Sequence, residues 1–200
     1  MPSDIFRIHL GDTPLSDDER KGLIPSISTQ GELNEFEFHN ILSGRRWALN
    51  PRRLGKSDVL SATFLLELHR RMFRATWRWA GKFRTTNKNF GVDPHRIATD
   101  VGALLGDTEY WIAHATHPAD EIALRFHHRL VLIYPFPNGN GRHSRLMADV
   151  LVTKLGRPEF PWGANTGDPE SIRQSYLKAL RLADQADYTA LFTFARSGKF

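Results

Sequence analysis

Apolar residues recur every three or four positions along most of this chain, a spacing that places them on one face of an α-helix. The pattern predicts one helix that ends near Trp79, another that ends before Pro118, and three more beyond it, with a short last helix from Asp187. The positions that form these faces are Leu60, Phe64, Leu68 and Met72; Val101, Leu105, Thr108 and Ile112; Ile122, Phe126, Leu130 and Ile133; Leu146, Val150 and Thr153; Ile172, Tyr176, Leu180 and Ala183. Because strands and helices do not alternate, the expected fold is mainly α, in a single domain over residues 1–200.

Polar and turn-forming residues show where the chain breaks between helices. Residues 1–27 are polar and irregular and are expected to form an N-terminal arm. Thr29-x-x-Glu32 is a capping box, so a helix is expected over about residues 28–42. Residues 48–57 contain a proline and a glycine and are expected to form a loop.

Residues 82–98 are the least helical part of the chain. β-branched and aromatic residues, which favour extended chain, are mixed there with glycine, aspartate and proline, which favour turns. The segment is therefore expected to form a short β-hairpin flap.

The composition indicates which class of protein, cellular compartment and ligand charge to expect. Hydrophobic residues make up 40% of the chain, enough for a sizeable core, but no run reaches the roughly 18 apolar residues of a membrane span. Cysteine is absent, which excludes disulfides, and the N-terminus has no apolar stretch of signal-peptide length, so a cytoplasmic protein is expected. The net charge of +5 suits a phosphate-bearing ligand or an acidic partner. So modest an excess is also common on a solvated surface, and nucleic-acid binding is not expected from it.

The segment with the clearest chemical pattern is YPFPNGNGRHSR, residues 134–145. Glycines let the backbone approach an anion closely, and the first N–H groups of the helix that follows lack partners within it. Arg142 and Arg145, three positions apart, would stand beside this positive helix end. The pattern predicts a phosphate site; the alternative is an ordinary glycine turn between two helices, with arginines at the surface.

The same segment resembles the signature of the Fic family, H-P-F-x-[D/E]-G-N-G-R-x-x-R. The matching residues are Pro135, Phe136, Gly139, Asn140, Gly141, Arg142 and Arg145. The resemblance covers nearly the whole chain. WRWAGKFRT (residues 77–85) is similar to the segment that leads to the Fic flap, and RFHHRLVLI (residues 125–133) and YLKALRLADQADYTALF (residues 176–192) resemble Fic helices. The start GLIP…STQGELNEFE resembles the subgroup called mobile mystery protein B, which implies a bacterial toxin–antitoxin setting and an antitoxin-like partner.

Fic proteins commonly transfer AMP from ATP to a hydroxyl of a target protein, so the resemblance implies ATP as substrate and a Ser, Thr or Tyr hydroxyl as acceptor. It also implies that the nucleotide is bound by Asn138, Gly139, Asn140, Gly141, Arg142 and Arg145. Asn140 and Arg142 would join the residue at position 134 in the catalytic set. The flap would hold the target by strand-like pairing through Thr85, Thr86, Asn87, Phe90, Gly91 and Val92.

The first departure from the signature concerns the proton acceptor. The family's catalytic histidine, which takes the proton from the attacking hydroxyl, falls on Tyr134. A phenol has an ordinary pKa near 10 and is a poor base at neutral pH, and loss of a general base lowers a rate by about 10²–10⁴-fold. The alternative is that Tyr134 is a packed helix-end residue with its hydroxyl on a backbone group. His143, in the first turn after the loop, is a conceivable substitute base, but a surface or phosphate-contact role is expected for it.

The second departure is Asn138, where the family usually has an acid that holds Mg²⁺. An amide oxygen is a hard ligand without charge, so the resemblance implies Mg²⁺ binding that depends on the nucleotide.

Glu32 has two interpretations. Many Fic proteins carry an inhibitory helix, S/T-x-x-x-E-G/N, whose glutamate pairs with the second loop arginine. Residues 28–32 fit this pattern, but Leu33 stands where glycine or asparagine is expected. The competing interpretation is that Glu32 only completes the capping box.

These observations predict a Fic-type AMP transferase that is impaired because Tyr134 replaces the base. The alternative is a non-catalytic nucleotide-binding module that associates with a target or an antitoxin-like partner.

Overall fold

Helices build almost all of the chain over residues 15–199, which the computed structural model describes. Residues 1–14 of the predicted arm, and Phe200, lie outside the described residues. The helices are α1 (Asp17–Arg20), α2 (Gln30–Ala48), α3 (Pro51–Lys56), α4 (Ala62–Phe73), the 3-10 helix η1 (Pro94–Arg96), α5 (Ile97–Ala113), α6 (Ala119–Ile133), α7 (Asn140–Lys154), α8 (Pro169–Ala183) and α9 (Thr189–Arg196). The expected mainly α fold is confirmed.

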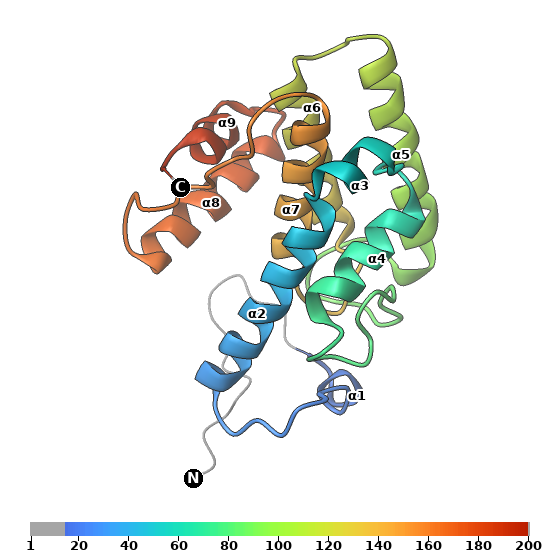
Figure 1. Ribbon diagram of the computed structural model, residues 1–200, viewed down its shortest axis with the longest axis vertical. Helices are drawn as coiled ribbons and strands as arrows, with labels where there is room; N and C mark the ends of the chain where they lie inside the picture. Colours follow the sequence, from blue (N-terminus) through green and yellow to red (C-terminus); the bar gives the residue numbers. More distant parts are fainter. Residues whose placement is uncertain (1–14, 200) are drawn as a thin grey trace.

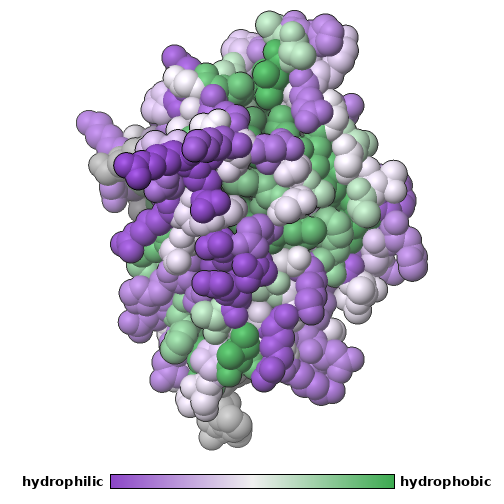
Figure 2. Space-filling view, turned by 45° about the vertical axis from the view of Figure 1, so that its right-hand side comes forward, coloured by the Kyte–Doolittle hydropathy of each residue, from purple (hydrophilic) through white to green (hydrophobic). Residues whose placement is uncertain are grey.

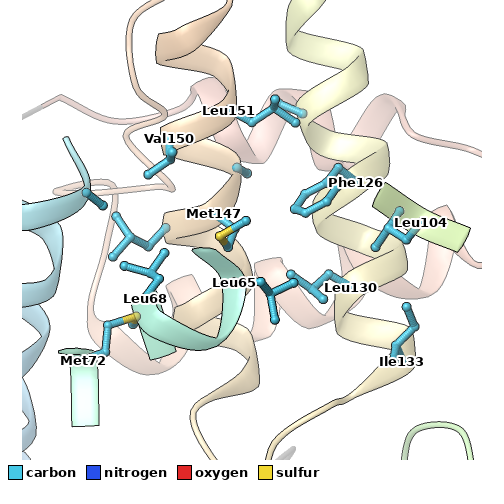
Figure 3. Close-up of a cluster of buried hydrophobic side chains, with 14 of the residues drawn as sticks. Leu65, Leu68, Met72, Leu104, Phe126, Leu130, Ile133, Met147, Val150 and Leu151 are labelled. Atoms are coloured by element: carbon cyan, nitrogen blue, oxygen red, sulfur yellow. The ribbon is translucent and has the colours of Figure 1, made fainter. Parts of the chain in front are cut away.

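The centre of the fold is the pair of helices α6 and α7, which lie side by side (Figure 1). α2 packs on α4, which covers α7 from one side, while α5 lies against α6 and the pair α8 and α9 covers the other side. Figure 3 shows the core between α4, α5, α6 and α7, formed by side chains that include Leu65, Leu68, Leu104, Phe126, Leu130, Met147 and Leu151. Full burial of one such side chain contributes about 1.5–3 kcal/mol.

Hydrophilic residues cover much of the surface seen in Figure 2, with hydrophobic side chains visible between them. Among the described residues, no helix combines the length and the apolar character that crossing a membrane requires.

The helix expected to end near Trp79 ends at Phe73 instead. The N–H groups of Thr76 and Trp77 turn back to the carbonyl of Phe73, at 2.9 and 2.8 Å. The chain then pairs with the N-terminal arm, where the Ile24 N–H donates to the Thr76 carbonyl at 2.9 Å. Trp77 is 1% exposed, so burial of this indole decides where the helix ends.

Residues 48–57 were expected to form a loop, and this expectation is wrong because they contain α3. Asn50 caps this helix, since its Oδ1 accepts the N–H groups of Arg52 and Arg53 at 3.1 and 3.3 Å. Pro51 stands at the first helical position, where its missing N–H carries no penalty. The proline that indicated a loop therefore starts a helix.

The predicted flap is present, but among the described residues it contains no regular strand. Its N–H groups bond the chain beside the loop, from Arg84 to the Pro135 carbonyl at 2.9 Å and from Val92 to the Ile133 carbonyl at 3.3 Å. The Arg84 guanidinium fills the space where cross-strand bonds would run and donates to the carbonyls of Thr86 at 2.8 Å and of Val92. A buried arginine, 2% exposed, thus replaces the expected hairpin ladder.

Candidate functional site

Residues 134–145, called the anion loop here, connect α6 to α7 and present the start of α7. Gly139 is the N-cap of α7, and no side chain caps this helix. The first hydrogen bond of the helix runs from the His143 N–H to the Gly139 carbonyl at 2.9 Å. The N–H groups of Asn140, Gly141 and Arg142 therefore precede any partner within the helix and lie at its positive end. This uncapped helix start has the geometry of the anion site that the sequence predicts.

Only glycine fits at position 139. Its φ of 77° lies in the left-handed region, and a Cβ there would come within 2.5 Å of the Phe73 ring. The loop consequently packs tightly on the end of α4, and any side chain at position 139 would push the loop away from Phe73.

The Asn140 side chain closes the loop instead of facing a ligand. Its Oδ1 accepts the Phe136 N–H at 2.9 Å and its Nδ2 donates to the Phe136 carbonyl at 2.8 Å. Asn140 is 2% exposed, and Phe136 is fully buried, as expected. Both ends of this amide are bonded within the loop, so the side chain holds the loop together, while the backbone N–H of Asn140 is left to contact an anion.

The two loop arginines contact different neighbours of α7. Arg142 lies toward α2 and α4, with its guanidinium carbon 5.0 Å from the centre of the Phe73 ring. Arg145 lies toward α8, 4.8 Å from the centre of the Tyr176 ring. An anion at the start of α7 would thus have two arginines of the first turns of this helix nearby.

Glu37, a residue that the sequence analysis missed, holds Arg142. Its Oε2 accepts from Arg142 Nη1 at 2.5 Å, and its Oε1 accepts the Trp77 indole N–H at 2.7 Å. Glu37 is 5% exposed. Its position four residues after the buried Leu33 and four before Ile41 was the available signal, because it places a carboxylate on the apolar face of α2.

Glu32 does not reach a loop arginine, so the expected inhibitory contact with Arg145 is not met. Its Oε2 accepts the N–H groups of Ser28 and Thr29 at 2.8 and 3.1 Å, and Thr29 Oγ1 accepts the Glu32 N–H at 3.2 Å. The Glu32 side chain is exposed to solvent and completes the capping box at the start of α2. The glutamate beside the loop is Glu37.

Tyr134 ends α6 in the left-handed conformation, with φ 53° and ψ 60°. Its carbonyl accepts from Arg84 Nε at 2.7 Å, and its ring centre lies 6.5 Å from that of Phe90 in the flap. The flap also packs directly on it at Gly91, where a Cβ would come within 2.6 Å of Tyr134 Cβ. Tyr134 is half-buried. Position 134 therefore lies between flap and loop.

His143 is not placed to accept a proton at the loop. It is fully buried, and its Nε2 donates to the Leu65 carbonyl at 3.0 Å, away from the loop. Burial lowers the pKa of His143 to about 3, so the ring is neutral at physiological pH. The expected surface or phosphate-contact role is also wrong, because this side chain belongs to the core.

Asn138 is poorly placed for a metal. Its Oδ1 accepts the Gly139 N–H at 2.5 Å, so the amide folds back on the loop. Among residues 15–199, no group of three or more His, Cys, Asp or Glu side chains could hold a metal ion. A Mg²⁺ ion at the loop would therefore be held mainly by nucleotide phosphates and water, and the protein would add at most the neutral Oδ1 of Asn138.

His69 is a second residue that the sequence analysis missed, and it joins the loop to the flap. Its Nε2 donates to the Asn138 carbonyl at 3.1 Å, while its Nδ1 accepts the Gly81 N–H at 2.9 Å. The ring stacks on Phe136, with 3.6 Å between ring centres. Burial holds the pKa of His69 well below its ordinary value, which keeps the ring in the neutral form that both bonds require.

Two substitutions separate the two bonds of His69. In His69→Gln the longer side chain brings its amide N–H₂ to the Asn138 carbonyl, the partner of His69 Nε2. In His69→Asn the shorter side chain places its amide oxygen near the Gly81 N–H, the partner of Nδ1, and its N–H₂ does not reach Asn138. We expect His69→Asn to weaken binding of a non-hydrolysable ATP analogue by about fivefold, the value of one hydrogen bond, and His69→Gln to change it by less than about twofold. Calorimetry measures both. Equal losses would mean that His69 acts only through packing.

Most of the predicted target-binding residues of the flap are accessible. Thr85, Thr86, Asn87, Phe90 and Gly91 are exposed, and Val92 is half-buried. The base of the flap is tied to the arm, because Thr86 Oγ1 donates to Glu19 of α1 at 3.0 Å and Lys88 pairs with the same carboxylate. The flap is therefore anchored to the arm, and most of its residues beside position 134 are exposed.

Residues 59–152, which include α4, the flap and the anion loop, match the model of the Fic/DOC family. The chain therefore carries a Fic/DOC family domain, as the loop signature indicated.

Among curated relatives, the protein adenylyltransferase Fic of Drosophila grimshawi is 32% identical over 166 residues, 80% of this chain and 33% of that protein. The protein of the same name from Aedes aegypti is 31% identical over 167 residues. The chain spans about a third of the length of these relatives.

Solved structures share the fold. A Fic-1 fragment from C. elegans superposes with a TM-score of 0.64 at 26% identity, over 89% of this chain and 51% of that chain. BepC from Bartonella tribocorum, solved with bound AMPPNP, has a TM-score of 0.66 at 16% identity, over 90% of this chain and 97% of that chain. The second likeness shows the fold alone.

Proposed function

We propose that this domain binds ATP at the anion loop and is a protein AMP transferase whose turnover is slow because Tyr134 occupies the position of the base. The observation that carries the proposal is the uncapped start of α7, whose first N–H groups have no partner within the helix and whose first turns carry Arg142 and Arg145. The packing of the flap on position 134 adds to it. The name of the relatives, protein adenylyltransferase, supports the reaction. The AMPPNP bound to BepC supports the ligand class.

In this reaction a Ser, Thr or Tyr hydroxyl oxygen of the target attacks the α-phosphorus of ATP. A bond forms between that oxygen and phosphorus, the bond to the β-phosphate oxygen breaks, and pyrophosphate leaves. The N–H groups of α7 and the two arginines would stabilise the negative charge on the phosphates. The hydroxyl proton needs an acceptor near position 134, and a phenol supplies a poor one at neutral pH.

A direct test follows label from ATP that carries ³²P on its α-phosphate. We expect the unmodified chain to bind ATP but to label itself or lysate proteins slowly. Rapid labelling would show that a group other than position 134 accepts the proton and would overturn the impaired-base part of the proposal.

Asn138 gives a separate test of where a Mg²⁺ ion carried by the nucleotide would contact the protein. Replacing Asn138 with aspartate adds a charged oxygen ligand, so the apparent Mg²⁺ affinity in the presence of an ATP analogue should rise by about fivefold. Calorimetric titration of Mg²⁺ checks this, with Asn87→Asp on the exposed flap as the charge-matched control. An equal change in both variants, or none, would show that position 138 does not contact the ion.

A second candidate function is a non-catalytic module that uses nucleotide binding to control association with a partner. The replacement of the base by Tyr134 favours it, since the phosphate site survives without efficient chemistry. The resemblance to mobile mystery protein B suggests a bacterial toxin–antitoxin setting and an antitoxin-like partner. Nucleotide-dependent pull-down of a partner, without label transfer after the base is restored, would favour this function over the transferase.

A further inference from the structure

A basic cavity lies far from the anion loop, between the end of α2 and α3. It has a volume of about 460 Å³, and the cations that line it are Arg46, Arg52, Arg53 and Lys56. We call it the α2–α3 pocket. None of its residues belongs to the site described above.

The cations of this pocket have no carboxylate partner within residues 15–199. Several other arginines among the described residues are paired with carboxylates: Arg71 with Glu67 at 2.6 Å, for example, and Arg45 with Glu159. The carboxylate next to the pocket in sequence, Asp58, accepts the Leu60 N–H at 3.2 Å. Like charges gathered without counterions repel one another, and an anion in the pocket would relieve this repulsion.

Two contacts hold parts of the pocket in place, one at the Arg53 side chain and one at the backbone of α3. The Arg53 guanidinium lies 4.9 Å from the centre of the Trp47 ring, which fixes its position. Lys154, at the end of α7, donates to the carbonyls of Leu54 at 3.0 Å and Ser57 at 2.5 Å. This fifth cation anchors α3 and adds to the positive field at the rim. Positions fixed in advance reduce the entropy that binding must overcome.

The aromatic ring of the pocket is not free to stack on a nucleobase. Trp47, the aromatic residue that lines it, stacks on Phe64 with 5.2 Å between ring centres, and the Arg53 and Arg71 guanidinium groups lie over its ring. Its faces are therefore occupied by the protein. A helix of six residues spans about 9 Å, the length of about three residues of extended peptide at 3.3 Å each. The footprint suits a few neighbouring carboxylates better than the long phosphate backbone of a nucleic acid.

We propose that the α2–α3 pocket docks an acidic segment of a partner protein, with two or three aspartate or glutamate side chains facing its four cations. α7 separates the pocket from the anion loop by its own length, about 22 Å for 15 residues. A partner docked in the pocket would leave the loop and the flap accessible. The inference stands independently of the AMP transfer proposed above.

The test uses a fluorescein-labelled octaglutamate peptide and measures its anisotropy with the unmodified chain. Arg46→Glu combined with Arg52→Glu reverses two exposed charges of the pocket without touching Trp47. The control, Lys178→Glu combined with Arg181→Glu, reverses two exposed charges on α8 and matches the change in net charge. We expect the pocket variant to bind the peptide about fivefold more weakly or worse, and the control to stay within about twofold of the unmodified chain. Binding should also weaken as salt rises from 50 to 300 mM.

Equal losses in the two double variants would overturn the proposal, because they would show that net charge alone attracts the peptide. So would a peptide affinity weaker than about 1 mM for the unmodified chain. A third outcome is that a single-stranded oligonucleotide of the same charge binds more tightly than the peptide and loses this binding in the pocket variant. It would assign the pocket to nucleic acid and reject the peptide. Circular dichroism confirms that each variant is folded.

Discussion

Tyr134→His is expected to raise transfer of labelled AMP by about 10²-fold, within the range that a general base supplies. An imidazole with an ordinary pKa near 6.5 accepts a proton at neutral pH far better than a phenol does. The substitution changes no other part of the site, because the glycines and both arginines of the loop remain. Histidine also tolerates the left-handed conformation that Tyr134 adopts at φ 53° better than most side chains do.

Tyr134→Phe is the matched control for this prediction. It keeps the ring that packs beside Phe90 and Gly91 but carries no group that can accept a proton. Initial rates of labelling with α-³²P-ATP compare the three proteins at equal nucleotide saturation. Faster labelling by histidine than by tyrosine and phenylalanine supports the missing base. No labelling by the histidine variant, with nucleotide binding intact, would remove the transferase function and leave the binding module.

The second large effect concerns Glu37, whose carboxylate already occupies Arg142. A phosphate that approaches Arg142 must displace this carboxylate or share the guanidinium with it, and the two anions repel each other. Glu37→Gln removes the charge while keeping an acceptor for the Trp77 indole N–H. We expect the affinity for a non-hydrolysable ATP analogue to rise about 10-fold, as for a hydrogen bond to a charged group.

Calorimetry measures the affinity, and Glu32→Gln is the control because Glu32 lies on the same helix in solvent and contacts no loop arginine. The control should leave the affinity unchanged. If Glu37→Gln also leaves it unchanged, the Glu37–Arg142 pair is a structural contact and does not compete with phosphate. A fall in affinity would mean that Glu37 orients Arg142 for the phosphate.

The sequence was sufficient to predict the mainly α fold and the anion loop, because both depend on local rules. Apolar spacing marked α5, α6, α7 and α8, and glycines next to a helix start marked the loop. Prediction of the helix end and of the hairpin failed because a long-range contact overrides the local signal at each place. The arm draws Thr76 and Trp77 out of a helix, and Arg84 satisfies carbonyls that a hairpin would otherwise pair.

The roles of single side chains were the hardest to predict. Asn140 and His143 stand in the signature segment, yet both face inward and bond backbone groups. Glu37 and His69 lie outside that segment and reach it only because α2 and α4 pack beside α7. A single sequence does not tell which side of a helix faces which neighbour, so these contacts appear only with the fold.

The central claim is that the start of α7 and its two flanking arginines form a nucleotide site. It is tested most directly by calorimetry of a non-hydrolysable ATP analogue with the unmodified chain and with the Arg142→Ala and Arg145→Ala variants. Arg181→Ala on α8 serves as the control for lost surface charge. The account predicts measurable binding by the unmodified chain, a loss of about 10-fold or more for each loop arginine, and no loss for Arg181→Ala. Equal affinity in all four proteins, or no binding by the unmodified chain, would contradict it.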